Sequence, residues 1–219
     1  MVPGVSGAPN MASVEKLPFP TIVSSAANAS TATTASVSMP AGNVGDLIIA
    51  AFSVVSGSTR TISTPSGFTQ QYNDIPTNVS QHRRAALYTR VANGSEGATI
   101  SAALSGTSEW GAVALRIRGW GDLAISAAAN STTTSNPNPP ALTPPWEEMQ
   151  TLWLAFVHGY NAAGDAPVDY TMIQQIGDDN GRMAVAARFL EAASEDPGPF
   201  AGTNNWYART LAIKPAPAS

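Results

Sequence analysis

The sequence predicts an all-β protein: a β-sandwich, jelly-roll-like, built from two tandem repeats that share one core and preceded by an extended N-terminal arm. Three features of the sequence lead to this fold class. Apolar or alternating segments of strand length recur along the chain. Clusters of Pro, Gly, Asn and Asp separate these segments. The strands of the first half also reappear in the same order in the second half.

We divide the chain into an arm of residues 1–20 and a sandwich domain of residues 21–215. Within the domain, the first repeat covers about 35–119, a crossover covers 120–146, and the second repeat covers about 147–215. A unit the size of one repeat would be marginally stable alone, so we expect the two repeats to pack around a shared core. The expected core residues are Ile49, Phe52, Leu87, Val113, Leu115, Leu154, Phe156, Val185, Leu211 and Ile213.

The arm is rich in Pro, Gly, Ser and Ala and has no core of its own. The backbone N–H and C=O groups of such a segment cannot all be satisfied locally, so we expect the arm to lie on another chain. The apolar residues expected to contact that partner are Val2, Val5, Met11, Leu17 and Phe19.

The first repeat has the pattern of short strands separated by turns. From Thr21 onward the pattern is β, and the run LIIAAFSVV at 47–55 is typical of a strand that is buried on both faces or lies in a sandwich core. Pro65-Ser66-Gly67 has turn composition. The strands expected here are 35–39, 47–55, 60–64, 68–72, 84–92, 98–105 and 110–118, and WGDLAISAAA at 120–129 is expected to add an outer strand.

Four segments of the second half match segments of the first. LIIAAF, ending at Phe52, matches TLWLAF, ending at Phe156. The closing strand WGAVALRIR, which begins at Trp110, matches WYARTLAIK, which begins at Trp206. Between these, PSGFT matches PVDYT, and RAALYTR matches RMAVAAR. The spacing of the matches falls in order from 104 to 96 residues, as small loop deletions would produce. For this reason we assign the first part of 183–195 to a strand, although its composition is that of a helix.

Composition and charge exclude several functional classes. The net charge is −4 and no basic stripe is present, so we expect no nucleic-acid partner. No apolar stretch approaches the length of a membrane span, and we expect no membrane partner. The chain has no cysteine, which excludes disulfides and thiolate chemistry. Charged residues make up only 12%, so the polar surface comes from Ser, Thr, Asn and Gln, which suits a protein packed among neighbours or an adhesive module.

We expect no catalytic residue, no metal ligand and no cofactor. His82 and His158 lie in different halves; we expect the first to be solvated and the second to be partly packed or at a rim. The stretch GDDNGR at 177–182 has the pattern of a hairpin turn, with a cation site as the alternative. Of the tryptophans, Trp120 and Trp146 flank the crossover and are the candidate contacts for a glycan or a protein partner.

The segments MPAGNVGDLIIAAFSV, TPSGFTQQYND, ALYTRVA, ATISAALSG and WGAVALRIRG resemble modules in structural proteins of tailed bacteriophages, both head-decoration and tail-fibre proteins. The resemblance covers about residues 35–215 and consists of turns and core positions. The turn at Pro65, Gly67, Phe68 and Thr69 matches well, whereas the second half has Asp169 in place of Gly67. The resemblance implies a fold and a setting but names no binding residue.

The resemblance implies a non-enzymatic virion structural protein, made in the cytoplasm of a bacterial host. We expect a capsid decoration or cement protein on the outside of the shell. Its expected partners are the major capsid protein and sister copies of this chain, as a homo-oligomer, a trimer. Two alternatives stay open: a tail-fibre or receptor-binding module that contacts host-surface glycans, and a secreted bacterial accessory or adhesin domain.

Overall fold

The computed structural model describes residues 16–55, 60–76, 83–131, 136–159, 164–176, 182–202 and 206–218. These residues form strands, turns and bends, and no helix occurs among them. The strands in chain order are β1 Thr21–Ser38, β2 Leu47–Val55, β3 Thr69–Asp74, β4 Arg83–Val91, β5 Thr99–Arg118, β6 Trp120–Ile125, β7 Ala129–Ser131, β8 Met149–Gly159, β9 Thr171–Ile176, β10 Arg182–Ala192 and β11 Trp206–Pro215.

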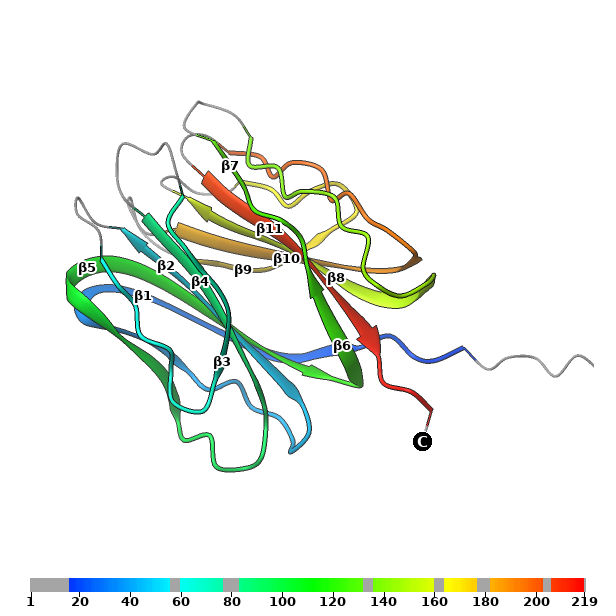
Figure 1. The fold of residues 1–219 in the computed structure, drawn as a ribbon, viewed down its shortest axis with the longest axis horizontal. Coiled ribbons are helices and arrows are strands. Elements are labelled where there is room, and N and C mark those ends of the chain that lie inside the picture. The colour runs from blue at the N-terminus through cyan, green and yellow to red at the C-terminus, as the bar shows by residue number, and fades with distance from the viewer. Residues whose placement is uncertain are drawn as a thin grey trace, which may run out of the picture.

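The strands of each repeat lie in one antiparallel sheet, and the two sheets pack face to face as a sandwich (Figure 1). Strand β1 is added to the first sheet, and the crossover strands β6 and β7 are added to the second. The first sheet has the order β1-β5-β2-β4-β3, and the second has the order β6-β11-β8-β10-β9, with β7 paired to β11. Strands β5, β2, β4 and β3 therefore correspond in order and pairing to β11, β8, β10 and β9. The predicted all-β sandwich built from two repeats is confirmed. The crossover supplies β6, the outer strand expected there.

The core between the sheets draws on both repeats. Ile49 and the residues on the same face of β2, β4 and β5 pack with residues of β8, β10 and β11, and this shared core follows from the apolar positions of both sets of strands. All ten residues expected in the core are buried. Nine of them lie between the sheets: Ile49, Leu87, Val113, Leu115, Leu154, Phe156, Val185, Leu211 and Ile213.

Both sheets are also covered on their outer faces, so that β2 and β8 are buried on both sides. On the first sheet, Val37 of β1 and Ile100 of β5 pack with Phe52 in a second buried cluster. On the second sheet, Leu142 and Phe200 lie in irregular segments and complete a third cluster. The two covering layers explain why β2 is a continuous apolar run without alternation.

The tenth expected core residue, Phe52, belongs to the outer cluster of the first sheet, whereas Phe156 lies between the sheets. The predicted match of Phe52 with Phe156 is therefore wrong by one residue. Trp110 lies opposite Val54, and Trp206 lies opposite Gly159. If the two tryptophans are equivalent, Phe52 corresponds to Val157 rather than to Phe156. Successive strand residues point to opposite faces, so this single step places the two phenylalanines on opposite sides of their sheets.

The segments 98–105 and 110–118, expected as two strands, form one continuous strand, β5. Its partner β1 is also long and pairs with it over most of its length, with irregularities at Ile22/Ser24 and Ala32/Thr34. The second irregularity lies where the β1–β5 ribbon bends, and it brings Ala35 and Val37 onto the outer face of the sheet.

The turn before β3 and the turn before β9 have the same backbone form despite their different sequences. In the first, Gly67 has φ of +77° and the Phe68 N–H donates to the Pro65 carbonyl at 3.1 Å. In the second, Asp169 has φ of +65° and the Tyr170 N–H donates to the Pro167 carbonyl at 3.0 Å. Asp is one of the few residues that adopt this conformation readily, so the substitution preserves the turn.

Candidate functional site

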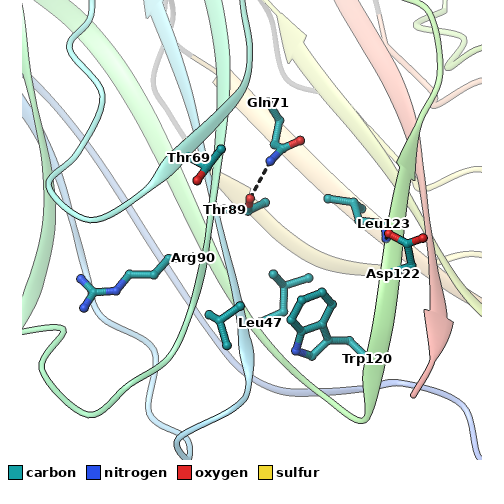
Figure 2. Close-up of a pocket in the computed structure, with 9 residues that line it drawn as sticks. Leu47, Thr69, Gln71, Thr89, Arg90, Trp120, Asp122 and Leu123 are labelled. Atoms are coloured by element: carbon teal, nitrogen blue, oxygen red, sulfur yellow. Dashed lines mark hydrogen bonds between the residues drawn. The ribbon is translucent and has the colours of Figure 1, made fainter. Parts of the chain in front are cut away.

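A pocket of about 270 Å³ opens between the two sheets, on the side where β3 and β4 face β6 (Figure 2). Trp120, at the start of β6, forms part of its wall, together with the apolar side chains of Leu47 and Leu123. Polar lining residues come from β3, β4 and β6, and they are Thr69, Gln71, Thr89, Arg90 and Asp122. Trp120, a candidate contact residue from the sequence, thus lies beside residues that are distant along the chain.

The polar groups of this pocket are neutral except for Asp122 and Arg90. The Gln71 Nε2 donates to the Thr89 hydroxyl at 2.7 Å. Asp122 is exposed, and its carboxylate accepts a hydrogen bond from the Leu123 N–H at 2.9 Å. The Lys214 ammonium lies 3.7 Å from the other Asp122 oxygen.

The guanidinium of Arg90 points away from the pocket toward a neighbouring loop (Figure 2). Its Nη2 donates to Asn93 Oδ1 at 2.9 Å and to Ser95 Oγ at 3.3 Å, and it lies 3.8 Å from a carboxylate oxygen of Glu96. Burial alone would raise the pKa of Glu96, but hydrogen bonds from the Asn93 and Gly94 backbone hold that pKa below its usual value. The charge of Arg90 is therefore satisfied within the chain.

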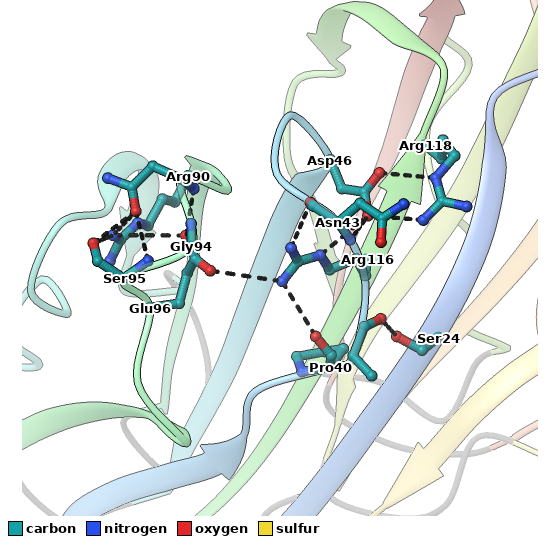
Figure 3. Close-up of polar contacts among 12 residues, drawn as sticks. Ser24, Pro40, Asn43, Asp46, Arg90, Gly94, Ser95, Glu96, Arg116 and Arg118 are labelled. Carbon is teal, nitrogen blue, oxygen red and sulfur yellow. Dashed lines mark hydrogen bonds and ion pairs between the residues drawn. The ribbon is translucent and has the colours of Figure 1, made fainter.

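A second polar cluster joins the turn before β2 to the end of β5 (Figure 3). Asp46 is 3% exposed and accepts hydrogen bonds from the Asn43 N–H at 2.6 Å, from Arg116 Nε at 3.3 Å and from Arg118 Nε at 3.1 Å. Arg116 is 4% exposed and also donates to the carbonyls of Pro40 at 3.3 Å and Asn43 at 2.6 Å. Burial would raise the pKa of Asp46, but the bonds from Arg118, Asn43 and Arg116 hold that pKa below its usual value.

The turn sequence MPAGNVGD is explained by this cluster. A Cβ on Gly42 would collide with Arg116 Nε and lie 2.5 Å from Asp46 Oδ2, so the close approach requires glycine. In the second repeat Ala212 stands where the first has Arg116, and no corresponding Gly-Asp turn precedes β8. We therefore interpret the cluster as a structural ion network that fixes the turn on the sheet.

A third cluster joins the two sheets at the end of β3. Tyr72 and Asp74 of β3 meet His158 of β8 and Tyr207 and Arg209 of β11. The Tyr72 hydroxyl and His158 Nε2 lie 3.3 Å apart. Tyr207 donates to Asp74, and Arg209 Nη2 donates to the same carboxylate at 2.6 Å. The Arg209 guanidinium also lies 4.6 Å from the centre of the Tyr72 ring, a cation–π distance.

His158 is 3% exposed, so the expectation of a rim or partly packed residue is wrong. Burial, with a smaller contribution from the charge of Arg209, lowers its pKa to about 3. Burial also raises the pKa of Tyr72 well above its usual value. His158 and Tyr72 therefore stay neutral near pH 7 and are buried within the sandwich. The cluster of Tyr72, Asp74, His158, Tyr207 and Arg209 connects the two sheets, and we call it the latch. His82 lies outside the described residues.

The other sequence candidates take different positions. Trp146 is half-buried against the outer cluster of the second sheet, and the Lys214 ammonium lies 5.4 Å from its ring centre. Leu17 and Phe19 are half-buried, and the Phe19 ring packs edge-on against Phe189 at 5.8 Å. Val2, Val5 and Met11 lie outside the described ranges. The GDDNGR turn also lies outside them except for its last residue.

Sequence reasoning missed most members of these clusters. Thr69 and Gln71 belong to a segment quoted for its turn, and Asp122 carries no motif. They meet at Trp120 only because β3 and β6 are facing edges of different sheets. The Asp46 cluster had a partial signal, since MPAGNVGDLIIAAFSV and WGAVALRIRG, which supply it, both belong to the quoted pattern. Nothing in that pattern indicated that their Asp and Arg residues meet. The latch had none, because pairing between sheets is not encoded by local spacing.

Within the described ranges, no group of three or more His, Asp or Glu residues is arranged to hold a metal ion. The same part of the chain contains no helix long and apolar enough to cross a membrane. Comparison with protein-family models, curated proteins and solved structures found no significant match to this chain.

Proposed function

We propose that this chain is a non-enzymatic structural protein of a tailed-bacteriophage virion, a decoration or cement protein that binds the outside of the capsid shell. The observation that carries the proposal is the anchored root of the N-terminal arm. The arm leaves the sandwich from a fixed point, as a tether between a rigid module and the major capsid protein requires.

The arm root, residues 16–20, contacts the end of β10. Lys16 Nζ lies 2.6 Å from a carboxylate oxygen of Glu191, and Phe19 packs on Phe189. Strand β9 pairs with β10 only as far as Ala187, so the arm root contacts a part of β10 that β9 does not reach. Phe189 remains 50% exposed, which leaves apolar surface beside the root for a partner.

We assign contacts with sister copies, in a trimer, to the outer edge of β1. This strand has 18 residues, forms an edge of the first sheet, and contains no charged residue and no proline. Monomeric proteins usually protect long edge strands with charges, prolines or a covering segment. The irregularities at Ile22/Ser24 and Ala32/Thr34 bend this edge, so the regular stretch between them is the part that supports pairing with another chain in the assembled particle.

The ionisable clusters also support a structural role. Asp46, Arg116 and Arg118 are bonded to one another. In the latch, Tyr207 and Arg209 bind Asp74 across the sheets, whereas the buried His158 Nδ1 has no hydrogen-bond partner among the described residues. A general acid or base needs a proton-transfer group within reach of substrate. In the described part of the chain, the buried histidine faces tyrosine rings rather than a pocket.

The test compares attachment of the full chain and of a variant lacking residues 1–15 to phage heads stripped of this protein. The deletion keeps every described contact, including the one between Lys16 and Glu191. We expect attachment to weaken at least tenfold, about 1.4 kcal/mol. Val168→Ser is the matched control, because it removes an apolar group that is 85% exposed on the sandwich itself. Unchanged attachment of the deletion variant would remove the arm from the mechanism.

The pocket at Trp120 favours a second candidate function, a tail-fibre or receptor-binding module that contacts glycans. A half-buried indole beside neutral hydrogen-bonding groups is suited to a small polar ligand. The particle would then carry the sandwich on its tail, with the pocket facing the host surface.

A further inference from the structure

The pocket between β3 and β6 has a preformed aromatic wall. The Trp120 indole N–H donates to the Gly45 carbonyl at 2.9 Å, and the ring packs against the shared core. The backbone next to Trp120 is also fixed: Gly121 lies so close to Pro215 of β11 that an added Cβ would collide with the Pro215 carbonyl oxygen. The ring is thus held in place without a ligand, which lowers the entropic cost of binding to it.

A β-bulge directs the opposite wall. Thr69 and Gln70 pair with Thr89 and Tyr88, and the next paired residue is Tyr72, so Gln71 is the extra residue of β3. Bulges redirect side chains and occur often beside binding sites. The Gln71 side chain reaches across to Thr89 through its Nε2. Its carbonyl oxygen Oε1 accepts no hydrogen bond from the part of the chain that the structure describes, so it is available as an acceptor at the pocket.

Asp122 provides the charged group at the pocket. Its carboxylate is exposed and, among the described residues, accepts one close hydrogen bond, from the Leu123 N–H. The remaining lone pairs can accept hydroxyl hydrogens. Carboxylate and amide oxygens both accept hydrogen bonds from ligand hydroxyls, and the bond to the charged carboxylate is the stronger one.

The charges around the pocket decide which ligand class fits. An anionic ligand would face Asp122 without a free counter-charge among the described lining residues, because the Arg90 guanidinium is turned away and bound to a neighbouring loop. The nearby Lys214 ammonium already lies beside Asp122. A wholly apolar ligand would cover the polar groups of Gln71 and Asp122 without satisfying them, which costs free energy. A sugar ring has an apolar C–H face and hydroxyls around its edge, and so matches both the indole and the acceptors.

We propose that this pocket binds a neutral pyranose, stacked on Trp120 and hydrogen-bonded to Gln71 and Asp122. The inference deepens the second candidate function by naming its ligand class. It also stands without the virion assignment, because the geometry requires only the isolated sandwich.

The test uses the isolated full-length protein and the methyl glycosides of glucose, galactose, mannose and N-acetylglucosamine. Saturation-transfer-difference NMR and tryptophan fluorescence titration report binding. We expect at least one of these glycosides to bind with a Kd in the millimolar range. Gln71→Ala and Asp122→Asn should each weaken that binding at least tenfold, and Trp120→Ala should abolish it.

Gln70→Ala is the matched control, since Gln70 is also exposed on β3 and does not line the pocket. It should bind as the wild type does. If Trp120→Ala does not fold, the two polar variants still decide the outcome, because both alter exposed side chains. The proposal is overturned if none of the four glycosides binds, if both polar variants bind normally, or if methyl N-acetylneuraminate binds more tightly than any neutral glycoside. A negative result removes the pocket assignment and leaves attachment to phage heads as a separate question.

Discussion

Replacing Asp46 by Asn should destabilise the fold strongly. The change keeps the shape and one acceptor oxygen but removes the negative charge beside Arg116, which is 4% exposed. The nearest remaining carboxylate in the described part of the chain, that of Glu96, lies 4.0 Å from Arg116 Nη1. Breaking a buried ion pair by removing one partner costs about 3–5 kcal/mol, because an uncompensated charge is left behind. We expect about 3 kcal/mol, since the Asn oxygen keeps part of the hydrogen bonding.

Urea unfolding followed by tryptophan fluorescence measures this loss. With an m-value of about 3 kcal/mol per molar, the midpoint should fall by about 1 M. Asp169→Asn is the matched control: its carboxylate pairs with Arg188 at 3.3 Å but is 64% exposed. Asn also tolerates the positive φ at this position, so the control should lose less than about 1 kcal/mol. Equal losses for the two variants would refute the claim that the Asp46 cluster stabilises the sandwich through burial.

Two further predictions concern the latch and the repeated turn. The folded state holds the pKa of His158 at about 3, against 6.5 in the unfolded chain, so only the unfolded state gains this proton as the pH falls from 6.5 toward 3. Stability should therefore decrease on acidification, by about 1.6 kcal/mol between pH 6.5 and 5. His158→Gln should remove this part of the slope in urea unfolding at the two pH values; an unchanged slope would show that His158 is not the group responsible. Gly67→Ala should cost about 1–2 kcal/mol, because φ is +77° and the new Cβ would lie 2.7 Å from the Arg90 guanidinium, whereas Asp169→Gly should be nearly neutral. Thermal unfolding of both variants tests this contrast, and equal losses would contradict the proposed equivalence of the two turns.

The strand order and the shared core were predictable because they depend on residue type at each position. Leu115 and Leu211 close their repeats with the same pattern of apolar residues, and both face the core. The segment at 183–195 illustrates the limit of composition. Its helix-forming residues occupy β10, because pairing with β8 and burial between layers outweigh local propensity.

The residue-by-residue alignment of β2 in the first repeat with β8 in the second could not be read from the sequence. Both strands are buried on both faces, so neither shows the alternation that would distinguish Phe52 from its neighbours. The outer cluster of the second sheet was missed for a related reason. Its covering segments contain Leu142 and Phe200 among Pro, Gly and Ala, without a regular period.

The candidate site was predictable only in part. Trp120 was identified from its place beside the crossover, but Gln71 becomes part of the pocket through a bulge that leaves no mark in the sequence. His158, Tyr207 and Asp74 are unremarkable one by one. Their meeting depends on which edges of the two sheets face each other, and a single sequence does not encode that arrangement locally.

Cryo-electron microscopy of intact virions is the most direct test of the proposed function, with the virions taken from the phage or prophage to which that function assigns this chain. We expect density for the two-sheet sandwich in many copies on the outer surface of the head, with residues 1–15 running from the root at Lys16 onto the major capsid protein. Density for the sandwich on the tail would instead support the receptor-binding alternative. Absence of the chain from purified virions, checked by mass spectrometry of the same sample, would contradict the virion assignment altogether.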